Sequence, residues 1–139
     1  MEAPIATGSL VMGALPTRHA RYRPQHTAVV ITAGGAERED RLTWSEFDAH
    51  VNRCANALAS LGVAKGDRVA TVLPNSLLLI TTYWACAKLG AVIVPLSPLL
   101  NANGLAALVA DALPRVVIGP ENVRAIEALI AEASARDPE

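Results

Sequence analysis

The succession of helix and strand signals between Leu42 and Leu96 constrains the fold of this chain more than any other feature. Two helical segments alternate there with two short runs rich in β-branched residues. A strand, a helix and a second strand form the parallel crossover unit, which is almost always right-handed. We therefore predict an α/β fold with a parallel sheet core and helices on both faces.

The first helix has clear start and stop signals. Thr43 can accept a backbone N–H bond, and Glu46, three residues later, can complete a capping box. Gly62 follows where a left-handed C-terminal cap requires glycine. The apolar positions between these signals recur every three or four residues, namely Phe47, Val51, Cys54, Leu58 and Leu61. This spacing places them on one buried helix face.

The second half of the stretch predicts a strand over Arg68–Leu73, a turn at Pro74-Asn75-Ser76 and a helix over Leu77–Leu89. This helix is apolar almost all round, which predicts burial on most sides. Gly90 ends it before a second strand, Ala91–Pro95.

The flanking segments extend the same pattern. Ala28–Thr32 and Arg38–Thr43, joined by Gly34 and Gly35, predict an N-terminal β-hairpin. The other predicted elements are a short helix over Pro16–Tyr22, a helix capped by Asn101 or Asn103 and ending near Ala112, a strand over Arg115–Ile118 and a helix over Asn122–Ala135. We expect residues 1–14 to form a mobile arm and residues 15–139 to form one α/β domain.

Composition narrows the class of protein. The net charge of −1, with acids and bases interspersed, argues against nucleic acid and anionic membrane surfaces as partners. The longest apolar run, Leu77–Ala87, is closed by Lys88 and is too short to span a membrane. Cys54 and Cys86 have neither metal-ligand spacing nor a disulfide-dense context, so we expect reduced, buried thiols and a cytoplasmic protein.

Catalytic signatures are absent from the sequence, so we predict no catalytic, cofactor-binding or metal-ligating residue in this chain. Glu46 and Asp48 point in different directions on a helix and cannot act as an acid–base pair. The other candidates have simpler structural or surface roles: His19, His26, His50, Trp44 and Trp84. The turn at Pro74-Asn75-Ser76 is the one place with a physical argument for ligand contact, but we favour helix capping by Asn75 or Ser76 as its role.

Three segments resemble the N-terminal part of adenylate-forming (AMP-binding) enzymes, the superfamily of acyl-CoA synthetases, luciferases and nonribosomal adenylation domains. Leu42-Thr43-Trp44-Ser45-Glu46-Phe47 resembles the first core motif, Leu-Thr/Ser-Tyr-x-Glu-Leu, and Lys-Gly-Asp-Arg-Val follows at residues 65–69. Ala87 to Leu96 resembles the second core motif, Leu-Lys-Ala-Gly-x-x-x-Val-Pro. Between them, Leu73-Pro74-Asn75-Ser76 matches a turn frequent in the family. The resemblance covers roughly residues 15–130.

The resemblance implies a parent enzyme that activates a carboxylate with MgATP to an acyl-adenylate and transfers the acyl group to coenzyme A. The phosphate loop, the ATP-contacting motifs and the catalytic lysine of that family have no counterpart in these 139 residues. We therefore expect an incomplete N-terminal subdomain, inactive alone, whose partner is the remainder of the enzyme. Benzoate-like, coumarate-like and fatty acids all stay open as substrates.

Two hypotheses follow. The first is an N-terminal fragment of an acyl-CoA ligase, which we expect to self-associate through apolar surface, most readily over Leu77–Leu89. The second is a free-standing α/β module that binds a small ligand or a protein at the carboxyl ends of its strands, without catalysis.

Overall fold

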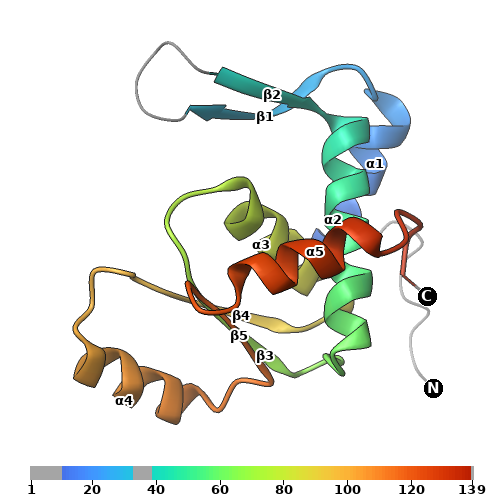
Figure 1. Ribbon diagram of the computed structural model, residues 1–139. Coiled ribbons are helices and arrows are strands. Elements are labelled where there is room, and N and C mark those ends of the chain that lie inside the picture. Colours follow the sequence, from blue (N-terminus) through green and yellow to red (C-terminus); the bar gives the residue numbers. More distant parts are fainter. Residues whose placement is uncertain (1–10, 33–38, 139) are drawn as a thin grey trace, which may run out of the picture.

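The computed structural model describes residues 11–32 and 39–138, and the hairpin tip predicted around Gly34 and Gly35 lies outside them (Figure 1). The helices are a 3-10 helix Met12–Ala14, α1 Leu15–Tyr22, α2 Trp44–Ser60, α3 Leu77–Leu89, α4 Ala102–Ala112 and α5 Val123–Glu132. The strands are β1 Thr27–Thr32, β2 Glu39–Thr43, β3 Arg68–Val72, β4 Val92–Leu96 and β5 Val116–Ile118.

The sheet β4-β3-β5 is parallel throughout, with β3 in the centre. Arg68 pairs with Val92 on one side, and Val69 pairs with Val116 on the other. Helices α2, α3 and α5 lie on one face of this sheet, and α4 lies on the opposite face (Figure 1). The predicted parallel core with helices on both faces is confirmed.

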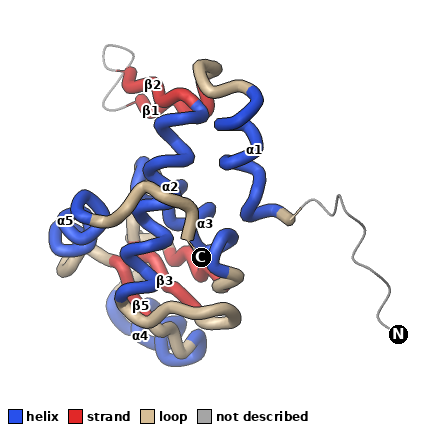
Figure 2. The backbone as a smooth tube through the Cα atoms, turned by 90° about the vertical axis from the view of Figure 1, so that its right-hand side faces the viewer, coloured by secondary structure: helices blue, strands red, loops and turns tan. Residues whose placement is uncertain are grey.

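Strands β1 and β2 form the predicted antiparallel hairpin, with an irregularity in register between Thr27 and Val29. The hairpin and the parallel sheet lie toward opposite ends of α2, so α2 connects the two sheets (Figure 2). The backbone N–H of Trp44, the first residue of α2, donates to the carbonyl of His26 at 2.9 Å. This bond fixes the hairpin to the start of the helix.

Polar side chains set the helix starts. The Thr43 backbone N–H donates to Glu46 Oε2 at 2.8 Å, and the Glu46 N–H donates to Thr43 Oγ1 at 3.2 Å, which confirms the predicted capping box of α2. Ser76 Oγ caps α3 by accepting from the Leu79 N–H, and Asn101, rather than Asn103, caps α4.

Asn122 does not cap α5 with its side chain, because that side chain bonds backward. Its Oδ1 accepts from the Gly119 N–H at 2.9 Å, and its Nδ2 donates to the Val117 carbonyl at 2.7 Å. The amide therefore stabilises the turn between β5 and α5 instead of the first helical turn.

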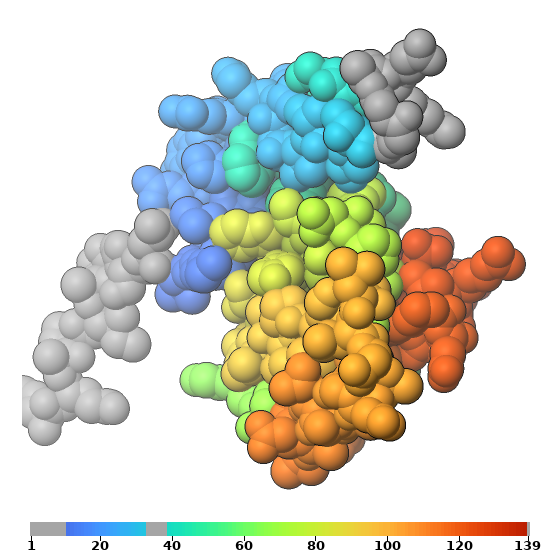
Figure 3. Space-filling view, turned by 90° about the vertical axis from the view of Figure 1, so that its left-hand side faces the viewer, coloured from blue at the N-terminus to red at the C-terminus, as the bar shows by residue number. Residues whose placement is uncertain are grey.

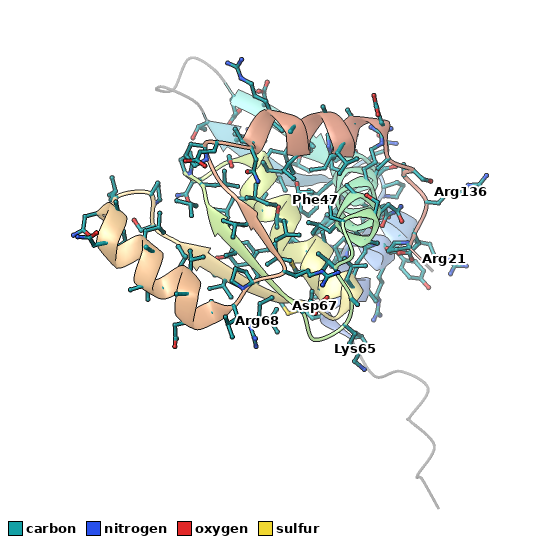
Figure 4. All side chains as sticks on the ribbon, turned by 60° about the horizontal axis from the view of Figure 1, so that its bottom comes forward. Arg21, Phe47, Lys65, Asp67, Arg68 and Arg136 are labelled. Atoms are coloured by element: carbon teal, nitrogen blue, oxygen red, sulfur yellow. The ribbon has the colours of Figure 1, made fainter. Side chains whose placement is uncertain are left out.

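The hydrophobic core lies between the sheet and the helices α2, α3 and α5. Its buried members come from all four of these sources, among them Leu58, Val69, Cys86, Ile118 and Ile126. Phe47 lies among the helices, whereas Arg21 and Arg136 point outward at the periphery (Figure 4). Arg21 is accordingly exposed to solvent.

Helix α3 is less enclosed than its sequence predicted. Thr81, Thr82, Ala85 and Cys86 are buried, but Tyr83 is 40% exposed. Helix α4 contains no buried residue, and its Leu108 is 43% exposed. Both helices therefore keep apolar surface uncovered in this chain.

The expected N-terminal arm falls largely outside the described residues, but its last part packs on the core. Gly13 is buried in the 3-10 helix Met12–Ala14, and a Cβ at this position would lie 2.5 Å from the Ala87 carbonyl oxygen. Only glycine permits this approach of two backbones. The packed part of the chain therefore begins before Leu15.

Candidate functional site

An apolar groove of about 930 Å³ lies beside α3. Its walls come from the segment Val11–Gly13, from β1, from the outer side of α3 and from β4. Figure 3 shows this face, where α3 (yellow-green) lies between the hairpin above it and the residues of β4 and α4 (orange) below it. Tyr83 and Trp84 line the groove, so Trp84 contributes to a surface cavity rather than to the core alone.

The turn Pro74-Asn75-Ser76 borders this groove. Ser76 is used for capping, since its Oγ accepts from the Leu79 N–H at 3.2 Å. Asn75 and Ser76 both line the groove, and Asn75 is exposed. Helix capping, the structural role predicted for this turn, is thus observed at Ser76. The turn also supplies polar groups to the mainly apolar wall of the groove.

A buried polar cluster around Lys88 is the main polar feature of the interior. Lys88 Nζ donates to Thr17 Oγ1 at 2.6 Å, to Asp48 Oδ1 at 3.0 Å and to Asp137 Oδ1 at 3.1 Å, and it also bonds to Asn52 Oδ1. The Lys88 side chain is only 4% exposed. These partners come from α1, α2 and the segment after α5, so one ammonium group joins three distant parts of the chain.

Asn52 and Asn56 extend this cluster along α2. Asn52 Nδ2 donates to the Ala135 carbonyl at 3.0 Å, and Asn56 Nδ2 donates to the carbonyls of Ser134 and Arg136 at 2.8 and 2.9 Å. The two amides therefore hold the segment after α5 against α2 through its backbone. This role is structural, because every donor is satisfied within the chain.

Sequence reasoning treated Lys88 only as the residue that closes an apolar run. A single charged residue inside an otherwise apolar helix was the available signal, since a lysine there must reach a partner or water. Its partners could not be identified locally, because Thr17 and Asp48 lie 71 and 40 residues away.

Two of the remaining candidates, His19 and Trp44, come together in the structure. His19 stacks on Trp44 with ring centroids 4.5 Å apart, and Trp44 meets Phe47 edge-on at 6.2 Å. Burial lowers the pKa of His50, with a further contribution from the neighbouring Arg53 charge. His26 is exposed.

Both cysteines are buried and unpaired, as expected. Burial raises the pKa of Cys54 to about 11 and that of Cys86 to about 12. Thiols with such pKa values are poor nucleophiles at neutral pH.

Within residues 11–32 and 39–138, no three His, Cys, Asp or Glu side chains gather where they could hold a metal ion. The helices in the same part of the chain are all too short or too polar to cross a membrane.

Comparison with known proteins identifies relatives along almost the whole chain. The AMP-binding enzyme family matches residues 16–139. Feruloyl-CoA synthase from an Amycolatopsis species is 39% identical over 128 residues, which cover 91% of this chain and 25% of that protein. The long-chain-fatty-acid–CoA ligase FadD13 of Mycobacterium tuberculosis is 42% identical over 94 residues, which cover 67% of this chain and 19% of that ligase.

The fold agrees with these relatives. The inhibitor-bound N-terminal domain of FACL13 from Mycobacterium tuberculosis superposes with a TM-score of 0.81 at 28% identity, over 92% of this chain and 37% of that domain. The chain thus spans about a quarter or less of the length of the curated relatives it matches. It belongs to the AMP-binding enzyme family and has the fold of the N-terminal part of an adenylate-forming ligase.

Proposed function

We propose that this chain is the N-terminal scaffold of an ATP-dependent acyl-CoA ligase. The observation that carries the proposal is the 39% identity with feruloyl-CoA synthase over 91% of the chain. In such an enzyme a carboxylate attacks the α-phosphorus of ATP, which releases pyrophosphate and forms an acyl-adenylate. The thiol of coenzyme A then attacks the acyl carbon, which forms the thioester and releases AMP.

Within this scheme the chain supplies structure and no reacting group. The polar contacts of Lys88, Asn52 and Asn56 hold helices and the C-terminal segment together. The Glu46 carboxylate is engaged in the capping box. These engagements support a scaffold role, with ATP, Mg²⁺ and coenzyme A bound by the remainder of the enzyme.

Carboxylate-dependent exchange of labelled pyrophosphate into ATP tests the proposal. The 139-residue chain should give no exchange above a boiled control. The negative charge that develops at the α-phosphate during the reaction must be stabilised, and this chain lacks the phosphate loop and the catalytic lysine that would do so. A longer polypeptide that carries this segment should exchange with at least one acid from a panel of ferulate, benzoate and long-chain fatty acids. Exchange by the short chain, or none by the longer polypeptide with any carboxylate, would contradict the proposal.

Self-association of the isolated chain is a second part of the proposal. The apolar groove beside α3 and the partly exposed Tyr83 support it, because exposed apolar surface of this extent favours pairing. Light scattering over a concentration series should show a mass above that of one chain, and Tyr83→Glu should reduce it. A monodisperse monomer at high concentration would favour the free-standing binding module.

A further inference from the structure

Asn103-Gly104, in the first turn of α4, is the one asparagine–glycine dipeptide in this chain. Asparagine followed by glycine is chemically labile, because the glycine nitrogen can attack the side-chain amide carbon and no side chain on the glycine obstructs it. Asn103 is exposed to solvent, and so is Ala102 before it. The sequence and the exposure together put a reactive amide on the surface.

The folded first turn of α4 holds this reaction back. The Gly104 backbone N–H, whose nitrogen is the nucleophile, donates to Asn101 Oδ1 at 2.7 Å, and the Leu105 N–H donates to the Asn101 carbonyl at 3.0 Å. Asn103 itself lies within the helix. Ring closure requires a rotation about its Cα–C bond that a helical backbone does not allow. The reaction must therefore wait until the first turn opens.

The first turn of α4 is weakly held apart from this cap. None of the residues of α4 is buried. The helix lies by itself on one face of the parallel sheet, at the periphery of the molecule (Figure 1). Glycine is among the poorest helix-forming residues, so Gly104 weakens the turn that contains it. A segment opens readily where few buried contacts are lost, and this turn loses few.

We propose that Asn103 is a site of spontaneous deamidation and that the Asn101 cap sets its rate. When the first turn opens, the Gly104 nitrogen gives up its proton and bonds to Cγ of Asn103, and the bond from Cγ to Nδ2 breaks. Nδ2 leaves as ammonia with that proton, and a cyclic succinimide remains. Water then adds to one of the two ring carbonyls and opens the ring, which gives aspartate or isoaspartate at this position.

The two products have different consequences for α4, although both add a negative charge to its start. A carboxylate in the first turn of a helix interacts favourably with the helix dipole, so aspartate should leave the helix intact. Isoaspartate routes the backbone through the former side chain and lengthens it, which is incompatible with regular helical hydrogen bonding. Formation of isoaspartate should therefore loosen the start of α4.

The other asparagines of the chain are internal controls. Asn75 is exposed but precedes Ser76, and Asn101 precedes Ala102, so a side chain hinders the attacking nitrogen at both positions. The side-chain amides of the other three donate hydrogen bonds to backbone carbonyls: Asn52, Asn56 and Asn122. Asn103 should therefore convert before any other asparagine.

Incubation of the 139-residue chain at pH 8, followed by trypsin digestion and tandem mass spectrometry, tests the proposal. Residues 89–115 form one tryptic peptide, in which fragment masses distinguish conversion of Asn103 from conversion of Asn101. Asn101→Ala should speed conversion about fivefold in the folded protein, the factor that corresponds to a cap worth about 1 kcal/mol. Asn101→Asp keeps a capping acceptor and should convert no faster than the parent chain. In urea, which unfolds α4, the parent chain and Asn101→Ala should convert at one common, faster rate.

Three results would overturn the proposal. Equal rates for the folded parent chain and Asn101→Ala would show that the cap does not control the reaction. Conversion of the folded chain as fast as in urea would show that the helix gives no protection, and earlier conversion of another asparagine would show that Asn103 is not the labile residue. Circular dichroism reports whether each variant is folded. If Asn101→Ala is not, hydrogen exchange of the Gly104 amide in the parent chain decides, since exchange as slow as that of the buried strand β3 would contradict an easily opened turn.

Discussion

Lys88 Nζ lies 3.0 Å from Asp48 Oδ1, and the two side chains are only 4% and 13% exposed. The pair joins α3 to α2 in the interior, while Thr17 of α1 donates to the same Asp48 oxygen at 2.9 Å. Removing one partner of a buried ion pair leaves the other charge uncompensated, which costs more than the pair itself contributes.

Lys88→Met is therefore expected to lower the free energy of unfolding by about 3–5 kcal/mol. Chemical denaturation followed by circular dichroism measures this change. The exposed pair Arg41–Glu39, at 58% and 40% exposure, provides the control, and Arg41→Ala should change stability by less than about 1 kcal/mol. A Lys88→Met effect as small as that of Arg41→Ala would contradict a structural role for the cluster.

The capping box of α2 gives a pH-dependent prediction. The hydrogen bond from the Thr43 backbone N–H, followed by that from its side chain, lowers the pKa of Glu46 below 4.5. A carboxyl group with a lowered folded pKa stabilises the protein above its unfolded pKa, and this contribution disappears as the pH falls through the folded pKa. Stability should accordingly fall below about pH 4.5 as Glu46 becomes protonated.

Thr43→Ala should lower the free energy of unfolding by about 1 kcal/mol at neutral pH, because the helix loses its cap. Glu46→Gln should make the free energy of unfolding fall less steeply as the pH is lowered, because glutamine does not titrate. Ser45→Ala, one residue inside the helix and exposed, is the matched control with little expected effect. Denaturation at several pH values between 3 and 7 makes the comparison. An unchanged pH profile in Glu46→Gln would argue against the capping box as its source.

The elements that the sequence predicted well are those set by nearby residues. Thr43 with Glu46, Ser76 with Leu79, and Gly90 with its positive φ of 68° act within a few positions, so pattern and chemistry suffice. The Lys88 cluster depends instead on contacts between helices far apart in the chain. Local signals also predicted helix α4, but they could not show that none of its residues is buried in this chain.

The two cysteines should resist thiol reagents in the folded protein. Burial raises the pKa of Cys54 to about 11 and that of Cys86 to about 12, so little reactive thiolate exists near pH 8. Ellman's reagent at pH 8 should label neither cysteine in native protein and both in denaturant. Rapid labelling of either thiol without denaturant would mean that the core between α2 and α3 opens readily.

The same burial predicts a loss of stability at alkaline pH. A group whose folded pKa is raised contributes stability that is fully present below its unfolded pKa, here 9.0, and that is lost as the pH rises toward the folded value. Unfolding free energy should therefore decline above pH 9. The double variant Cys54→Ala/Cys86→Ala should lose less unfolding free energy between pH 9 and higher pH than the parent chain. Its free energy of unfolding should be lower at every pH, because removing the two thiol groups leaves cavities in the core.

Thr71, in the central strand β3, is completely buried, and its hydroxyl has no hydrogen-bond partner among the described residues. Burying a hydroxyl without a partner is unfavourable, and valine has nearly the same shape without this polar group. Thr71→Val should therefore raise the free energy of unfolding by about 1 kcal/mol. Thr82→Val is the matched control in the same core, because the Thr82 hydroxyl donates to the Leu78 carbonyl at 2.7 Å, and its loss should bring no gain. If Thr71→Val is neutral or destabilising while Thr82→Val behaves as expected, the Thr71 hydroxyl has a partner in solution, such as a buried water molecule.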